Sequence, residues 1–392
     1  MIEYFRVEPY VFINKNDQKI LFYNTIDGIY LEYYFHNEIW TISENILIVK
    51  FERPNDLYDQ FKIDLADKKM AFKFLGDKVF APNMFNKIEI EFKRQLELNK
   101  AKDNDELMQC VTNITICANG AISTLKNLNF LKLQFDIFSN ADKGRKQISF
   151  DTIKHLFSKI SFPNLVSISI TGSLLYRNAS FNNFLIFLKT LYKVKLFISY
   201  SEYTKNLYTH MPEIEYHIIC DDVFFEKFPH EYEKFIDKEV CFHLYLSNND
   251  ELNFLETNET KINLFKFHLE PYYSNNYPFL SQLISYTKEG LFENKKSMLK
   301  IIRNNFINEL FFGSLVIHND GDVFSNIQSS SLGNIESDKF PEILYNASQD
   351  KKSWLYSRST YIHCNKCLFN SLCPSLTLIE LTSNFVFCKS II

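Results

Sequence analysis

The stretch HCNKCLFNSLCPS, residues 363–375, places three of the chain's eight cysteines at the spacing C-x2-C-x5-C. A C-x2-C pair turns the backbone so that both sulfurs face one ion, and two further thiolates complete a tetrahedral or cluster site. The candidate ligands are Cys364, Cys367, Cys373 and the more distant Cys388. Spacing alone does not separate zinc from an iron–sulfur cluster, because both take four thiolates. A third interpretation is that these cysteines are buried apolar fillers.

Composition restricts the class of protein around this segment. The 392 residues carry 43 basic and 47 acidic side chains, a net charge of -4, so the chain lacks the broad positive surface that nucleic-acid binding requires. No apolar run approaches the ~20 residues of a membrane span, and the first residues do not form a signal peptide. We therefore expect a cytoplasmic protein with no membrane and no nucleic-acid partner. In a reducing compartment, clustered cysteines favour metal binding or redox chemistry over disulfides.

The first hundred residues predict a small β-rich domain. Apolar and polar residues alternate in short runs, which is typical of a meander of hairpins, and turn residues at Asn16-Asp17 and Asp27-Gly28 interrupt them. The runs cover residues 10–13, 19–25, 29–35, 39–42 and 46–52. Apolar residues then recur at helical spacing over 55–75, and residues 89–108 are charged and helical enough to predict a connector. We place the domain at residues 1–100.

Residues 101–305 predict a β/α barrel, full or partial. Candidate buried strands alternate with amphipathic helices such as 150–160 and 181–191, which favours parallel βαβ units. The strands are expected at 111–117, 165–171, 193–199, 215–220, 239–246 and 262–269. Barrel chemistry normally lies on loops leaving the strand C-termini, but the loops after the first two strands are poor in catalytic residues. We therefore name no catalytic residue.

A third unit, residues 306–392, contains the cysteines. Residues 308–326 predict a β-hairpin that turns at Asn319-Asp320-Gly321, since glycine supplies the positive φ of a tight turn. A helix is expected at 340–348.

These motifs together resemble the SPASM region that follows the barrel in radical SAM enzymes modifying ribosomally made peptides. That region houses two auxiliary [4Fe-4S] clusters. Here the first cluster's positions are lost: Asn326 and Thr377 stand at two of them, and no cysteine lies between Cys241 and Cys364. The positions of the second cluster are all filled, by Cys364, Cys367, Cys373 and Cys388. The resemblance thus implies one [4Fe-4S] cluster, with zinc as the alternative.

The same comparison bears on the barrel. Radical SAM enzymes carry C-x3-C-x2-C after the first strand, whereas here Cys117 is followed by a loop without a second cysteine. Cys110 has the wrong spacing to replace it. Of the family's glycine-rich segment that binds S-adenosylmethionine, Gly172 alone remains. The resemblance therefore implies no S-adenosylmethionine and no radical SAM chemistry.

The opening residues resemble the pseudo-radical-SAM proteins with a degenerate SPASM domain found in Bacteroidetes Gly-Gly-leader peptide maturation systems. The implied fold is α/β: a partial radical-SAM-like β/α barrel with a small N-terminal β-rich domain and a C-terminal SPASM-like cysteine domain. The N-terminal strand order also resembles leader-recognition modules, which bind a leader as an added strand.

The leading hypothesis for function is a non-catalytic accessory or scaffold protein in maturation of ribosomally made, post-translationally modified peptides. Its partners would be a radical SAM/SPASM peptide maturase and a precursor peptide. Two alternatives remain: a SAM-independent iron–sulfur redox enzyme, and a zinc-stabilised peptide-binding scaffold. Whether any catalysis remains is left open by the sequence. Asp221-Asp222 suits a helix N-cap better than a cation site. For His318 and His363 there are two interpretations: an ordinary surface or core histidine, or a histidine that replaces a cysteine as a cluster ligand.

Overall fold

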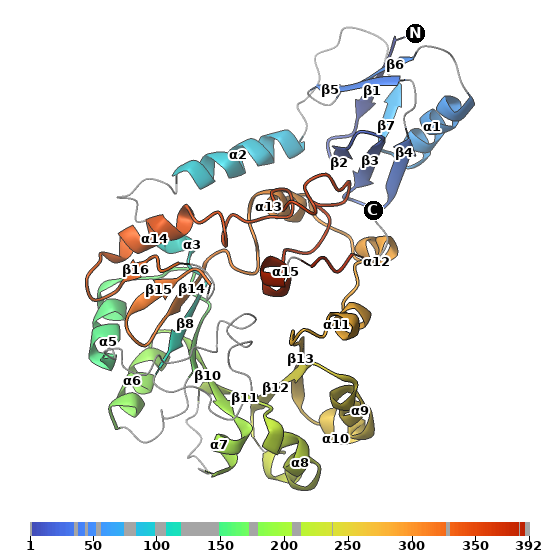
Figure 1. The fold of residues 1–392 in the computed structure, drawn as a ribbon. Helices are drawn as coiled ribbons and strands as arrows, with labels where there is room; N and C mark the ends of the chain where they lie inside the picture. The colour runs from blue at the N-terminus through green and yellow to red at the C-terminus, as the bar shows by residue number, and fades with distance from the viewer. Residues whose placement is uncertain are drawn as a thin grey trace.

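The computed structural model describes residues 2–34, 38–43, 46–51, 56–73, 84–98, 107–118, 149–171, 179–205, 213–236, 238–326, 330–383 and 385–388. It shows a mixed α/β protein with one large sheet and two small ones (Figure 1). No helix in these ranges is long and apolar enough to cross a membrane.

The N-terminal part contains both small sheets. The first three runs of the predicted meander form the antiparallel sheet β2-β3-β4, whereas the last two, β5 and β6, pair with each other in a second sheet of order β5-β6-β1-β7. Sequence patterning missed β1 and β7, which pair with each other across a long separation. The bounds are β1 Ile2–Val7, β2 Val11–Lys15, β3 Lys19–Asn24, β4 Tyr30–Tyr34, β5 Glu38–Ser43, β6 Ile46–Phe51, β7 Ala71–Lys73, α1 Asp56–Asp67 and α2 Met84–Leu98.

The large sheet has the order β13-β12-β11-β10-β9-β8-β14-β15-β16, in which β8 to β13 are all parallel. The predicted alternation of parallel strands and helices is therefore confirmed. The strands are β8 Asn113–Cys117, β9 Ser167–Thr171, β10 Lys193–Ser199, β11 Ile214–Ile219, β12 Val240–Leu246 and β13 Lys266–Pro271. The helices are α3 Leu107–Cys110, α5 Phe150–Lys159, α6 Ala179–Lys189, α7 Tyr200–Lys205, α8 Asp222–Glu231, α9 Asn249–Thr257 and α10 Glu259–Ile262, with a 3-10 helix at Tyr232–Phe235.

One strand boundary was predicted wrongly. The apolar run at 262–269 begins in α10, where Ile262 is buried, and the chain turns before β13 starts at Lys266. Short apolar runs fit a buried helix as well as a strand, so periodicity alone misplaced this start. Most of the loop after β8, and Gly172 with the loop after β9, lie outside the described residues.

The two faces of the parallel sheet differ in chemistry because successive side chains of a strand point to opposite faces. On one face Leu196, Ile218 and Phe242 belong to the main hydrophobic core with the helices. On the other face the intervening residues of β11 and β12 include His217 and Cys241, which are also buried. This second face is therefore polar yet shielded from water.

The C-terminal segment extends the large sheet. The predicted hairpin is confirmed: β14 and β15 pair antiparallel, and Gly321 between them has φ +90°. β14 also pairs in parallel with β8, which joins the hairpin to the first parallel strand. The predicted helix at 340–348 is α14. The remaining bounds are α11 Tyr277–Leu283, α12 Lys288–Glu293, α13 Met298–Phe306, β14 Ser314–Ile317, β15 Asp322–Phe324, β16 Gly333–Asn334, α14 Phe340–Ser348 and α15 Leu378–Ser383.

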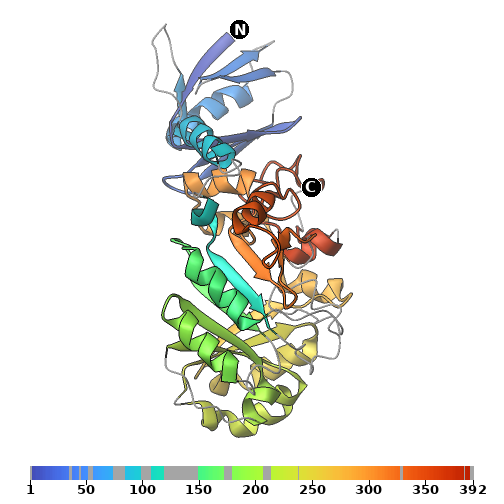
Figure 2. The same cartoon turned by 90° about the vertical axis from the view of Figure 1, so that its left-hand side faces the viewer.

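The N-terminal meander packs directly against the cysteine segment. Figures 1 and 2 both show the C-terminal segment between the N-terminal sheets and the large sheet. Leu21 and Tyr23 of β3 share a hydrophobic cluster with Leu368 and Leu372. The Tyr23 hydroxyl accepts a hydrogen bond from the backbone N–H of Lys296 at 2.7 Å. The β-rich unit and the cysteine segment are therefore in contact, although they lie at opposite ends of the sequence.

Candidate metal centre

All four predicted cysteine ligands line one cavity of about 370 Å³. The cavity also takes residues from two distant parts of the chain, the β2–β3 hairpin with Asn16 and Lys19 and Tyr286 before α12, and from Arg358 shortly before the first cysteine. Cys388 reaches it because the backbone N–H of Tyr286 donates to the carbonyl of Phe387 at 2.7 Å. Tertiary structure thus brings the fourth thiol to the three that are close in sequence.

The segment around the first three cysteines is held by turns, without regular secondary structure. The N–H of Cys367 donates to the carbonyl of Cys364 at 2.9 Å, and the N–H of Cys373 donates to that of Phe369 at 3.1 Å. The N–H of Phe369 donates to Sγ of Cys367 at 3.4 Å. This last contact places a backbone dipole against the sulfur and favours its thiolate form.

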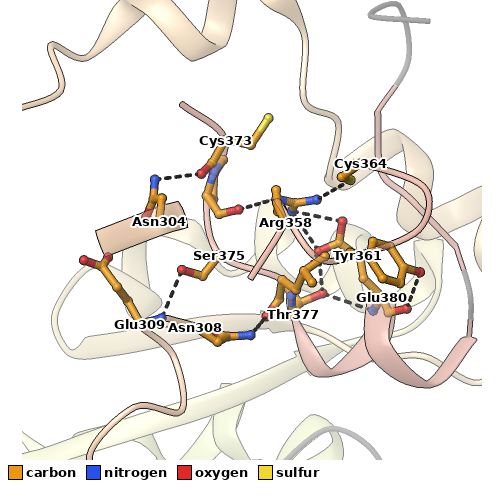
Figure 3. A network of polar contacts seen from close by, with 12 residues as sticks. Asn304, Asn308, Glu309, Arg358, Tyr361, Cys364, Cys373, Ser375, Thr377 and Glu380 are labelled. Atoms are coloured by element: carbon orange, nitrogen blue, oxygen red, sulfur yellow. Dashed lines mark hydrogen bonds and ion pairs between the residues drawn. The ribbon is translucent and has the colours of Figure 1, made fainter. Parts of the chain in front are cut away.

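Asparagine side chains fix the backbone of this segment from outside. Asn304 of α13 donates from Nδ2 to the carbonyls of Ser371 and Cys373, at 2.9 and 3.0 Å (Figure 3). Asn308 donates to the carbonyl of Leu376 at 2.9 Å. From the N-terminal sheet, Asn14 donates to the carbonyl of Leu368 at 2.8 Å. An irregular loop leaves carbonyls unpaired, and these amides satisfy them.

Arg358 is a buried cation next to the thiols. Its side chain is 3% exposed, and Nη1 donates to Sγ of Cys364 at 3.5 Å. Nη2 lies 3.0 Å from each carboxylate oxygen of Glu380, and Nε donates to the carbonyl of Pro374 (Figure 3). Thr377 adds a hydroxyl and an N–H to the same carboxylate. A positive charge is therefore fixed against the first cysteine.

Burial raises the pKa of the thiols of Cys364 and Cys367, and raises that of Cys373 to about 12. Arg358 acts in the opposite direction and lowers the pKa of Cys364, but burial is the larger effect. Without a bound group, these thiols are protonated at neutral pH. Binding of a metal or cluster would displace the protons, because the thiolate is the ligand.

The separation of the sulfurs bears on what they can hold. Zinc at about 2.3 Å from each of four tetrahedral sulfurs places the sulfurs about 3.8 Å apart. Among the described residues, one set of three Cys, His, Asp or Glu side chains has its ligand atoms within 4.8 Å of one another, and that set is His217, Cys241 and His243. The four C-terminal cysteines are not part of that set, and their donor atoms are all sulfur, which suits an iron–sulfur cluster as well as a single zinc ion.

The other residues singled out in the sequence have structural roles. Asp221 is the N-cap of α8, as favoured, and accepts from the N–H of Phe224 at 3.2 Å and that of Ser201 at 3.0 Å. Asp320 accepts from the N–H of Asp322 at 3.1 Å, which is turn chemistry. Nδ1 of His318 lies 3.3 Å from Oδ1 of Asp320 and is not among the cavity-lining residues, whereas His363 lines the cavity.

Sequence reasoning did not find Arg358, Glu380 or Asn14, because no motif marks them and their roles depend on packing. It also missed the set formed by His217, Cys241 and His243. The signal for that set was present: a C-x-H pair has the two-residue period that places both side chains on one face of a strand.

Comparisons with known proteins find similar solved structures, two of which are described here. No family model and no curated relative matches the sequence. SuiB of Streptococcus suis bound to S-adenosylmethionine is 11% identical, with 99% of each chain covered and a TM-score of 0.44. SuiB bound to the precursor peptide SuiA is 10% identical, with 94% of each chain covered and a TM-score of 0.42. Similarity this low supports no inference for this chain, so its function is inferred from its own residues.

Proposed function

We propose that this chain binds one [4Fe-4S] cluster through Cys364, Cys367, Cys373 and Cys388. The observation that carries the proposal is that all four thiols line a single cavity. Two further features support it: an N–H donor on Cys367 and a guanidinium on Cys364. When bound, the cluster would supply one-electron redox chemistry.

Within this proposal, the chain is a non-catalytic accessory protein of peptide maturation, a pseudo-radical-SAM protein with a degenerate SPASM domain. The sequence supports the absence of radical SAM catalysis, because it lacks the C-x3-C-x2-C cysteines whose cluster binds S-adenosylmethionine. Its partners would be a radical SAM/SPASM maturase and a precursor peptide. The three-domain division at residues 100 and 305 belongs to the same proposal, as does a cytoplasmic location.

The contact between the N-terminal meander and the cavity suggests how such a partner would reach the cluster. Asn16, Gln18 and Lys19 of the β2–β3 turn line the cavity together with the cysteines. A peptide held by the meander would therefore lie near the cluster. The cluster would serve either as a structural element that orients this sheet or as an electron relay to the maturase.

The second candidate is a SAM-independent iron–sulfur redox enzyme. One observation favours it: polar side chains that could contact a substrate, those of His363 and Lys366, line the cavity together with the cysteines. A zinc-stabilised scaffold would use the same four thiolates, and metal analysis separates it from the cluster protein.

The test is anaerobic purification followed by iron and sulfide analysis, and then a mass-spectrometric assay of the precursor peptide with the neighbouring maturase. We expect about four iron and four sulfide per chain. The peptide should be modified by the maturase, faster when this chain is added, and not by this chain alone. Zinc without iron would contradict the cluster assignment. Modification by this chain alone would contradict the accessory role and favour the redox enzyme.

A further inference from the structure

A second group of metal-binding side chains lies on the polar face of the large sheet. His217 is on β11, and Cys241 and His243 are on the neighbouring β12, in a register that pairs His217 with Cys241. One ring nitrogen of each histidine and Sγ of the cysteine all lie within 4.8 Å of one another. The three side chains are 5 to 6% exposed. Two parallel strands therefore place three soft or borderline donors at one buried point.

The hydrogen-bond partners of the two rings indicate which nitrogens carry protons. Nδ1 of His243 lies 3.3 Å from Oε1 of Glu270, which favours a proton on that nitrogen. Nε2 of His217 faces Oε2 of Glu215 at 3.6 Å, too far for a direct hydrogen bond, and has no other partner. A small rotation of the ring would let this nitrogen donate to the carboxylate. Each histidine thus has a carboxylate beside its outer nitrogen.

With protons on the outer nitrogens, the inner nitrogens present lone pairs to each other. Nδ1 of His217 and Nε2 of His243 are 2.7 Å apart, and one nitrogen of each ring lies within 4.8 Å of Sγ of Cys241. Two lone pairs at this separation repel unless a proton or a metal ion lies between them. Metal-bound histidines commonly donate their other N–H to a carboxylate, as His243 does here to Glu270.

We propose that His217, Cys241 and His243 bind one divalent ion of the zinc class, at a site separate from the four C-terminal cysteines. Two imidazoles and one thiolate are ligands typical of zinc, and three protein ligands leave a fourth position for water or substrate. A tetrahedral ion at about 2.1 Å from both nitrogens needs them about 3.4 Å apart. The rings would therefore separate by less than an ångström on binding.

The surroundings are compatible with the added charge. Glu215 and Glu270 lie beside the two histidines, and the amino groups of Lys195 and Lys266 act on the same cluster from β10 and β13. The ring of Phe197 stacks on that of His217, with centroids 4.6 Å apart. One divalent ion and one thiolate add a single positive charge, and the carboxylates of Glu215 and Glu270 offset the charges of Lys195 and Lys266.

The competing account is a plain hydrogen bond from Nδ1 of His217 to Nε2 of His243. It leaves Nε2 of His217 as a buried acceptor that faces a carboxylate without a donor, which is unfavourable. Metal binding distinguishes the two accounts.

The experiment uses the full chain, stripped of labile metal and titrated with Co²⁺ and separately with Zn²⁺. The wild-type chain should bind one more equivalent of metal ion than C241S or H243N. With Co²⁺, this extra equivalent should give a thiolate-to-cobalt charge-transfer absorption band. C110S is the matched control and should bind as much as wild type. Iron content of all variants should be equal, so this result is independent of the C-terminal site. Equal metal binding by wild type, C241S and H243N would overturn the proposal.

A milder variant keeps the proposal testable if those substitutions prevent folding. E270Q removes the negative charge beside Nδ1 of His243 and should weaken Co²⁺ affinity by roughly 10- to 100-fold. E239Q, at an exposed position next to β12, is its control and should leave the affinity unchanged. An unchanged affinity in E270Q, measured on a variant that melts at the wild-type temperature, would favour the plain hydrogen bond.

Discussion

Nη2 of Arg358 lies 3.0 Å from both carboxylate oxygens of Glu380, and Nη1 of the same side chain donates to Sγ of Cys364. The two side chains are 3% and 0% exposed, so this is a buried ion pair. It connects the turn before the first cysteine to α15, which follows the third. The pair therefore holds the segment closed around the cavity and directs positive charge at one thiol.

Replacing Arg358 by Gln should destabilise the chain strongly. The Glu380 carboxylate would remain buried without its cation, which costs roughly 3–5 kcal/mol in the free energy of unfolding. Chemical denaturation should show this loss, and R358Q/E380Q should recover part of it. K234A, which breaks an exposed ion pair with Glu231, is the control and should change stability by at most ~1 kcal/mol. Equal effects of R358Q and K234A would contradict the structural role of the pair.

Replacing Cys367 by Ser should abolish iron binding. The thiolate is one of four ligands, and folding of the segment beyond about residue 350 is coupled to the site, with apparent free energies on the order of 10 kcal/mol for structural metals. Iron analysis and limited proteolysis would measure the two effects. C110S, outside the cavity, should retain its iron. Stoichiometric iron in C367S would show that the ligands lie elsewhere.

The reduced protein should not cleave S-adenosylmethionine. Cys117 is followed by a loop without the two further cysteines that would leave an iron free to chelate this cofactor. Incubation with dithionite and S-adenosylmethionine should give 5′-deoxyadenosine at the level of the buffer control, as measured by liquid chromatography. Turnover by the pure chain would mean that a cluster is bound without those cysteines.

Replacing Asn14 by Ala should loosen the cysteine segment from the N-terminal sheet. The variant leaves the carbonyl of Leu368 without its 2.8 Å donor, which costs about 1–2 kcal/mol. Hydrogen exchange should rise at residues 368–373 and in the β2–β3 hairpin. K15A, the exposed neighbour, should exchange like wild type. Unchanged exchange in N14A would show that this hydrogen bond does not couple the two units.

A leader peptide should add to the free edge of β4. In the described residues β4 pairs with β3 and has no strand on its other side, so its backbone groups can pair with a peptide strand. Phe22 and Tyr23 of the central strand β3 are fully buried, so they belong to the core and not to a peptide pocket. The full chain mixed with its cognate leader should gain exchange protection in β4 and not in β6. No protection at hundreds of micromolar leader would exclude this edge.

The sequence alone determined those features that arise within short segments. Period-two alternation located β2 to β6, the Asn319-Asp320-Gly321 turn located the β14–β15 hairpin, and C-x2-C-x5-C located three candidate ligands. The strand and hairpin predictions succeeded because turn geometry and strand alternation are local properties, whereas the ligand assignment stays a prediction. The predicted start of β13 was wrong because a short apolar run, taken locally, fits a helix as well as a strand.

Tertiary structure decided what distant segments form together. Cys388 reaches the other cysteines through the bridge beside Tyr286, and Asn14 contacts Leu368 from the other end of the chain. Arg358 meets Glu380 only after the turns between them have closed. His217 and His243 are 26 residues apart and become neighbours because β11 and β12 pair in parallel. Such contacts depend on strand register and loop closure, which no short window of sequence specifies.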